Sequence, residues 1–207
     1  MNKIAGKLVQ LAIISTMALQ PLASMAADST EFTTITATTL GSNKMASDQL
    51  ALNTVFTDSE GNKYRITEDT ECCFVAPSSK KIKSIVIPDT VTASDGYTYN
   101  VVAVDQKAFK NCTKLKSVTL SANTRTIGNY AFQKCIKLKK ITIPSKVKII
   151  GKYAFYKCTS LKKVVFKTKV LTTIKDHAFK KVNSSVTYKY PSSKKKKYAK
   201  WVNAASD

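Results

Sequence analysis

The sequence predicts an α/β solenoid of short parallel strands joined by short helical turns, with a β-hairpin cap before it and a helical cap after it. Three observations support this fold class. The pair Ala-Phe begins at residues 108, 131, 154 and 178, which gives spacings of 23, 23 and 24 residues. Apolar residues and cysteines follow each pair in register. Turn sequences with Gly, Asn and Asp precede the repeats, as expected of a capped repeat array.

Seven columns define the repeat unit. In the second unit they are Ile127, Ala131, Phe132, Cys135, Leu138, Ile141 and Ile143. The equivalent residues are Val104, Ala108, Phe109, Cys112, Leu115, Val118 and Leu120 in the first unit, Ile150, Ala154, Phe155, Cys158, Leu161, Val164 and Phe166 in the third, and Ile174, Ala178 and Phe179 in the fourth. Because one unit cannot bury its own apolar face, neighbouring units must stack, and each column becomes a ladder.

The spacing inside one unit predicts its local structure. Ala131, Phe132, Cys135 and Leu138 lie at i, i+1, i+4 and i+7, which is the inner stripe of one or two helical turns. Residues 141–143 alternate apolar and polar, which predicts a short strand. The proline that follows has no N–H and would end the hydrogen-bonded ladder of that strand.

Turn signals predict an N-terminal β cap over residues 54–103. Gly61-Asn62 and Asp95-Gly96 each separate two β-rich segments, as the turns of β-hairpins do. The repeats of 23–24 residues then occupy residues 104–181.

Residues 182–207 are expected to form the C-terminal cap. Alternating apolar residues at 186–190 predict a last strand. A final helix is expected through residues 200–202, with Ser192 or Ser193 as its N-cap.

The first 26 residues resemble a secretory signal peptide. Lys3 and Lys7 begin it, residues 8–19 are mostly apolar, and residues 24–26 place small side chains at a cleavage site. The mature chain is therefore expected to be exported and to have no membrane span. Residues 27–53 are rich in Thr, Ser and Ala without a clear period, which predicts a flexible lead-in.

The charge of the chain is strongly positive and unevenly placed. Lys and Arg number 34 against 13 Asp and Glu, for a net charge of +21. Residues 27–79 hold eight acidic and three basic residues, whereas residues 80–207 hold 29 basic and five acidic ones. Such asymmetry indicates that the two parts have different roles.

The unit Ile127-Gly128-Asn129-Tyr130-Ala131-Phe132-x-x-Cys135-x-x-Leu138-x-x-Ile141-x-Ile143-Pro144 resembles the BspA-type bacterial leucine-rich repeat. The segment Tyr97–Val101 with its Asp-Gly turn is similar to what precedes such repeats. The resemblance runs from about residue 54 to near residue 200. It implies an extracellular or surface-associated protein used for adhesion and protein recognition. Asp105 and Lys175 depart from the repeat glycine.

Catalytic patterns are absent from the sequence. The one histidine, His177, occupies the repeat column of Tyr130 and Tyr153, which indicates a packing or surface role. No GxSxG, HExxH, P-loop or GxGxxG pattern occurs. We therefore predict a protein that is not an enzyme and has no catalytic residue, cofactor or metal site.

The cysteines allow two interpretations. In an exported protein they suggest disulfides or a metal site. Cys112, Cys135 and Cys158, however, lie on the inner stripe, and Val182 takes their place in the last unit, which favours small buried thiols. Adjacent Cys72-Cys73 would strain a mutual disulfide, so we expect them to be inert in the N-terminal cap, with a redox site as the alternative.

Lysines provide the candidate binding surface. Lys116, Lys139 and Lys162 recur at 23 residues, so stacking places them in one ladder. Two functions fit: recognition of an extracellular protein or cell-surface ligand, and electrostatic binding of a polyanion such as a wall polymer, sulfated glycan or nucleic acid. A solvated face is the alternative to both. The candidate binding residues are Lys116, Ser117, Thr119, Lys139, Lys140, Thr142, Lys162, Lys163 and Val165.

Overall fold

The computed structural model describes residues 49–206, which form part of one compact unit. The predicted signal peptide and residues 27–48 of the predicted lead-in lie outside the described residues. The last residues of that lead-in are bonded to the cap, since Leu50 N–H donates to Asp95 Oδ2 at 2.9 Å and Asn53 N–H to Ile66 O at 2.9 Å. Within residues 49–206, no helix combines the length and apolar character needed to cross a bilayer.

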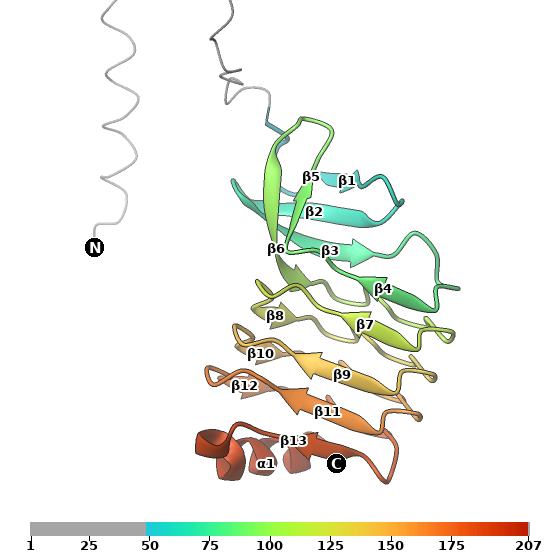
Figure 1. The fold of residues 1–207 in the computed structure, drawn as a ribbon, viewed down its shortest axis with the longest axis vertical. Helices are drawn as coiled ribbons and strands as arrows, with labels where there is room; N and C mark the ends of the chain where they lie inside the picture. The colour runs from blue at the N-terminus through green and yellow to red at the C-terminus, as the bar shows by residue number, and fades with distance from the viewer. Residues whose placement is uncertain (1–48, 207) are drawn as a thin grey trace, which may run out of the picture. The chain divides into compact units, whose positions relative to one another are not determined.

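Two rows of short parallel strands run along the repeats (Figure 1). One row, which we call the back sheet, joins β6 (Thr98–Val104), β8 (Thr126–Ile127), β10 (Ile149–Ile150) and β12 (Thr173–Ile174). The other row, the front strands, comprises β4 (Ser84–Val86), β7 (Ser117–Thr119), β9 (Lys140–Ile143), β11 (Lys163–Phe166) and β13 (Thr187–Lys189).

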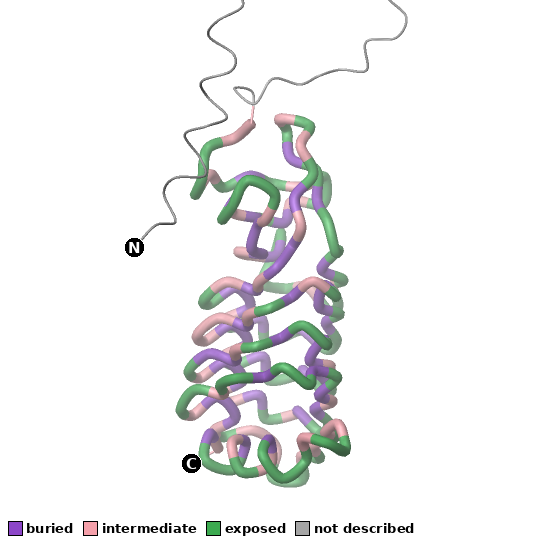
Figure 2. Tube along the Cα trace, turned by 90° about the vertical axis from the view of Figure 1, so that its left-hand side faces the viewer, coloured by how far each residue is buried: buried purple, intermediate pink, exposed green. Residues whose placement is uncertain are grey.

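The register of both rows confirms the predicted repeat. In the back sheet, Ile150 lies opposite Ile127 on one side and Ile174 on the other. Among the front strands, Ile141 lies opposite Val164. Along β7, β9 and β11 buried residues alternate with exposed or half-buried ones, and buried positions recur from coil to coil (Figure 2). The fold is therefore the predicted solenoid.

The segments between the two rows differ from the prediction in one respect, because they form turns that are not helical. Tyr130 and Lys134 have φ of 59° and 60°, and such left-handed residues cannot continue an α-helix. Phe132 N–H donates to Ala154 O in the next coil at 2.7 Å, instead of bonding within its own segment. The i, i+4 spacing thus arises from successive turns that repeat every four residues.

A stack of phenylalanine rings runs through the core. Phe132 lies between Phe109 and Phe155, with ring centroids 4.9 and 5.3 Å away and nearly parallel planes. Phe74 and Phe179 extend the stack at its two ends, at 4.9 and 5.1 Å from their neighbours. The ladder expected of the Ala-Phe column is therefore present.

The N-terminal cap contains the two predicted hairpins. β1 (Val55–Thr57) pairs antiparallel with β2 (Lys63–Glu68), and β5 (Thr90–Thr92) pairs antiparallel with β6. The turns between them use Gly61 at φ 81° and Gly96 at φ 77°, where residues other than glycine are strained. Strand β3 (Glu71–Ala76) pairs with β2 and, in parallel, with β6, which joins the cap to the back sheet.

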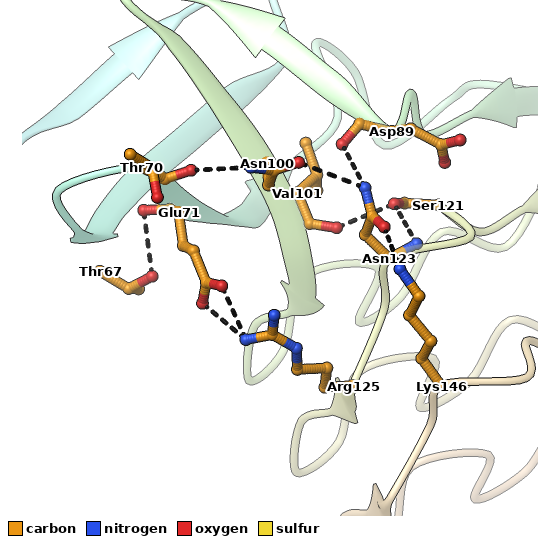
Figure 3. A network of polar contacts seen from close by, with 10 residues as sticks. All are labelled: Thr67, Thr70, Glu71, Asp89, Asn100, Val101, Ser121, Asn123, Arg125 and Lys146. Atoms are coloured by element: carbon orange, nitrogen blue, oxygen red, sulfur yellow. Dashed lines mark hydrogen bonds and ion pairs between the residues drawn. The ribbon is translucent and has the colours of Figure 1, made fainter.

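Side chains reinforce this junction (Figure 3). Arg125 lies 2.7 Å from Glu71 of β3. Asn123 donates to Asp89 O at 3.3 Å and accepts from Lys146 Nζ at 2.7 Å. Polar contacts therefore link the cap to the first two repeat units.

The C-terminal cap is a strand followed by a helix, as predicted. Helix α1 (Lys195–Ala204) buries Tyr198 and Val202 against the last coil, while a 3-10 turn at Ser192–Lys194 precedes it. Neither serine caps α1, since Lys194 occupies the N-cap position and no side-chain cap bond forms. The two serines instead lie in the 3-10 turn.

Candidate recognition surface

The outward side of the front strands, which we call the strand face, brings the predicted binding residues together. On β9 and β11, Lys140 lies opposite Lys163, and Thr142 lies opposite Val165. On β7, Ser117 and Thr119 are exposed on either side of buried Val118. Alternation along the strand explains this arrangement, because every second side chain faces outward.

Lysines form a ladder at the edge where the front strands begin. Lys162 N–H donates to Lys139 O at 2.9 Å, and Lys139 N–H to Lys116 O at 3.4 Å, so the three residues lie in successive coils. All three side chains are exposed. Their roles in binding stay a prediction.

Two lysines that sequence reasoning missed extend these columns. Lys83 continues the ladder, since Lys116 N–H donates to Lys83 O at 2.7 Å, and Lys189 lies opposite Val165 on the strand face. A signal for Lys83 was available, because it precedes Ser84 as Lys116 precedes Ser117. Lys189 required knowing the register of the last strand.

The lysine charges are not compensated by carboxylates within the described chain. Both ion pairs found in residues 49–206 use arginine: Arg65 lies 2.6 Å from Asp105, and Arg125 pairs with Glu71. Like charges in adjacent coils repel, and salt screens that repulsion only in part. The strand face therefore carries positive charge that no carboxylate of residues 49–206 compensates.

The front strands are not one continuous sheet. In the described chain, β4 and β7 form one ladder and β9, β11 and β13 form another. Between β7 and β9 lies an open groove of about 330 Å³. Its lining residues are Val118, Thr119, Leu120, Ala122, Thr142, Pro144, Ser145 and Lys167.

Comparison with known proteins shows the family to which the chain belongs. The profile of the BspA type leucine rich repeat region matches residues 77–200, in six copies. The chain belongs to the BspA-type leucine-rich repeat family. No curated protein sequence is significantly similar to it.

Solved structures of bacterial leucine-rich repeat proteins have a similar fold. A leucine-rich repeat protein from Bacteroides capillosus is 22% identical with a TM-score of 0.58, covering 65% of this chain and 96% of that one. The T. pallidum leucine rich repeat protein is 30% identical with a TM-score of 0.53, covering 65% and 64%. One from Bacteroides ovatus is 29% identical with a TM-score of 0.54, covering 62% and 35%. These likenesses support the fold.

The turns between the back sheet and the front strands of the BspA-type solenoid carry an aromatic column. Tyr153 stacks on Tyr130 at 5.3 Å and on His177 at 4.9 Å, so the histidine has the packing role that its column predicts. Lys110 and Lys152 lie over the rings of Tyr130 and Tyr153 at 5.9 and 5.5 Å. Because the ring faces cover one another, the column contributes to packing between coils.

All five cysteines are free and buried, which confirms the burial predicted for Cys112, Cys135 and Cys158. Cys158 Sγ donates to Phe132 O at 3.1 Å, a contact made across coils. Burial raises the pKa of Cys112 to about 11 and that of Cys158 to about 12, because the thiolate would be desolvated. A raised pKa removes the nucleophilic form at neutral pH.

These thiols predict a pH dependence of stability in alkali. The unfolded chain ionises near the ordinary thiol pKa of 9.0, while the folded chain holds Cys112 and Cys158 neutral up to about 11 and 12. Their contribution is therefore complete below pH 9 and is lost as the pH rises toward 11–12. Urea unfolding at pH 8 and pH 10.5 should show a lower free energy at the higher pH. In native protein at pH 8, iodoacetamide should label these two cysteines far more slowly than in urea, and equal rates would contradict their burial.

Proposed function

We propose that the mature chain is an exported, non-catalytic recognition module that binds an extracellular protein through the strand face. Membership of the BspA-type family supports a protein-interaction module, because leucine-rich repeats present extended surfaces to partners. The observation that carries the proposal is the register, which aligns the outward residues of β9 and β11 into continuous columns. Half-buried hydroxyl and aliphatic side chains, such as Thr142 and Val165, alternate there with exposed lysines and offer contacts other than charge.

A second function, binding of a polyanion, is favoured by the lysine ladder itself. Lys83, Lys116, Lys139 and Lys162 follow one another through four coils, bonded backbone to backbone. Lysine is a hydrated point charge without the bidentate geometry of arginine, so this binding would be electrostatic and would weaken steeply with salt. In this case the module would hold the exported protein at a charged surface.

A triple variant separates the two functions. Lys116→Gln, Lys139→Gln and Lys162→Gln together should leave affinity for a protein partner within a few-fold and mainly slow association. The same variant should lower affinity for a polyanion by roughly tenfold or more at low salt. The probes are heparin, single-stranded DNA and whole bacterial cells, before and after proteinase treatment, across a salt series.

A matched control removes the same charge from the turns that precede the ladder. Lys134, Lys157 and Lys181 form an equivalent column in the turns. Glutamine at these three positions should lower the affinity for either kind of partner only as much as the loss of three net charges does. Cell binding that is lost after proteinase treatment supports protein recognition. Binding that survives proteinase, collapses with salt and falls in the ladder variant would replace it with the polyanion function.

A further inference from the structure

We propose that the groove between β7 and β9 is an anchor pocket, which takes one apolar side chain from an acidic, extended protein segment lying across the strand face. The inference rests on the proposed protein-recognition function and names the chemistry of the partner. It is carried by the local opening of the solenoid, by the groove's apolar floor and by the charge around it.

The opening has a cause in the sequence. After β11, Lys167 N–H donates to Ile143 O in the previous coil at 2.9 Å, which closes the ladder at that end. Pro144 holds the equivalent position after β9 and has no N–H to donate to Leu120. The junction between β7 and β9 therefore lacks the bond that closes the junction between β9 and β11.

The backbone distances place the opening on the front side alone. Lys139 N–H to Lys116 O measures 3.4 Å, whereas the next coil closes at 2.9 Å between Lys162 N–H and Lys139 O. Behind the same junction, Lys148 N–H reaches Arg125 O at 2.8 Å, and β8 and β10 stay paired. The coils are thus more loosely bonded at the front of this junction than at the back.

The floor of the groove is aliphatic. Val118 and Leu120 are 9% and 7% exposed, while their counterparts Ile141 and Ile143 are 1% and 0% exposed. These two core side chains are therefore slightly more accessible than their counterparts in the next coil, and Pro144 adds an apolar wall. An aliphatic or aromatic side chain would remove this surface from water, which a sulfated sugar without such a side chain does not do.

The rim of the groove sets the charge of the partner. Thr119, Thr142 and Ser145 place hydroxyl groups around the opening, and Lys167 lines one end. Lys140 on β9 and Lys163 on β11 are also exposed on the strand face. Because these lysines have no carboxylate partner within residues 49–206, charge complementarity selects acidic residues beside the apolar anchor. A groove of about 330 Å³ is at the lower end of the size of ligand pockets, which suits a single side chain.

Two synthetic peptides test the pocket. Each has the sequence Glu-Glu-Thr-X-Thr-Glu-Glu with a fluorescent label, and X is leucine in one and alanine in the other. Binding to the chain from residue 27 to residue 207 is measured by fluorescence anisotropy at low salt. The leucine peptide should bind roughly tenfold more tightly, as expected for burial of the additional carbon atoms.

Two variants test whether the preference for the leucine peptide arises in the groove. Thr142→Trp fills the groove and should abolish the difference between the peptides, leaving both at the affinity of the alanine peptide. Thr187→Trp adds the same side chain at an exposed position on β13, outside the groove lining, and should keep the difference. Circular dichroism and thermal unfolding establish that both variants fold like the original chain.

The outcomes separate the pocket from the proposed function. Equal affinity for the two peptides would overturn the pocket and leave acidic recognition by the strand face in place. A leucine preference that persists in Thr142→Trp would also overturn it. No binding of either peptide would do the same, and the proposed function would then be decided by the proteinase-sensitive cell binding alone.

Discussion

Replacement of Phe132 by alanine is expected to lower the free energy of unfolding by about 3–5 kcal/mol. The ring is fully buried, and it stacks on Phe109 at 4.9 Å and on Phe155 at 5.3 Å. Its removal would leave a cavity between two coils, and it would take away two aromatic contacts as well as apolar burial. Urea-induced unfolding followed by circular dichroism measures the effect.

Ile136→Ala provides a control in the same coil. Its side chain is 40% exposed, and its truncation should cost well under half as much as that of Phe132. Because each coil contacts only its neighbours, the loss at Phe132 should also weaken the coupling between the coils on either side. Similar midpoints for the Phe132 variant and the original chain would show that the register of the phenylalanine stack is wrong.

The repeat register could be predicted from sequence because stacking imposes one period on every column. Phe132, Cys135 and Ile141 each recur in the neighbouring units, and only a solenoid uses all of these recurrences at once. The same reasoning placed Lys139 and Lys140 on ladders, since they lie between columns whose register the core sets. Residues tied to the core period were therefore predictable.

The turn conformation was not predictable from the same pattern. Spacing at i and i+4 is shared by a helix and by consecutive turns that place every fourth side chain inward. The left-handed φ of Tyr130 and Lys134 depends on hydrogen bonds to the next coil, such as the one from Phe132 N–H to Ala154 O. Pairings between coils are not encoded in the sequence of one unit.

The sequence contains only part of the information needed to predict the groove. Pro144 signals the end of a ladder, and that signal was present in the chain. Its consequence depends on which residue lies opposite in the previous coil, because an opening forms only where a neighbouring strand loses its donor. The exposure of Leu120 at that junction, 7% against none for Ile143, follows from the three-dimensional stacking.

Gly151→Ala is the second substitution with a large expected effect on stability, about 3 kcal/mol. A Cβ atom built on Gly151 would lie 2.5 Å from Asn129 N and 2.6 Å from Gly128 C, which are backbone atoms of the previous coil. The glycine is required here by the closeness of two coils, since even one methyl group would force them apart. Urea unfolding measures the loss.

The repeat column itself supplies the control, because its last member is not glycine. Lys175 already carries a side chain at this position in the fourth unit, with its N–H bonded to Ile150 O at 2.9 Å. Lys175→Ala adds no atom near the backbone and should change stability by less than about 0.5 kcal/mol. If Gly151→Ala unfolds at the same urea concentration as the original chain, the two coils can move apart at this contact to accept a methyl group at little cost. The close approach would then not require glycine. A large loss at Gly151 beside a small one at Lys175 is the expected result, because only the first substitution adds an atom where the backbones of two coils touch.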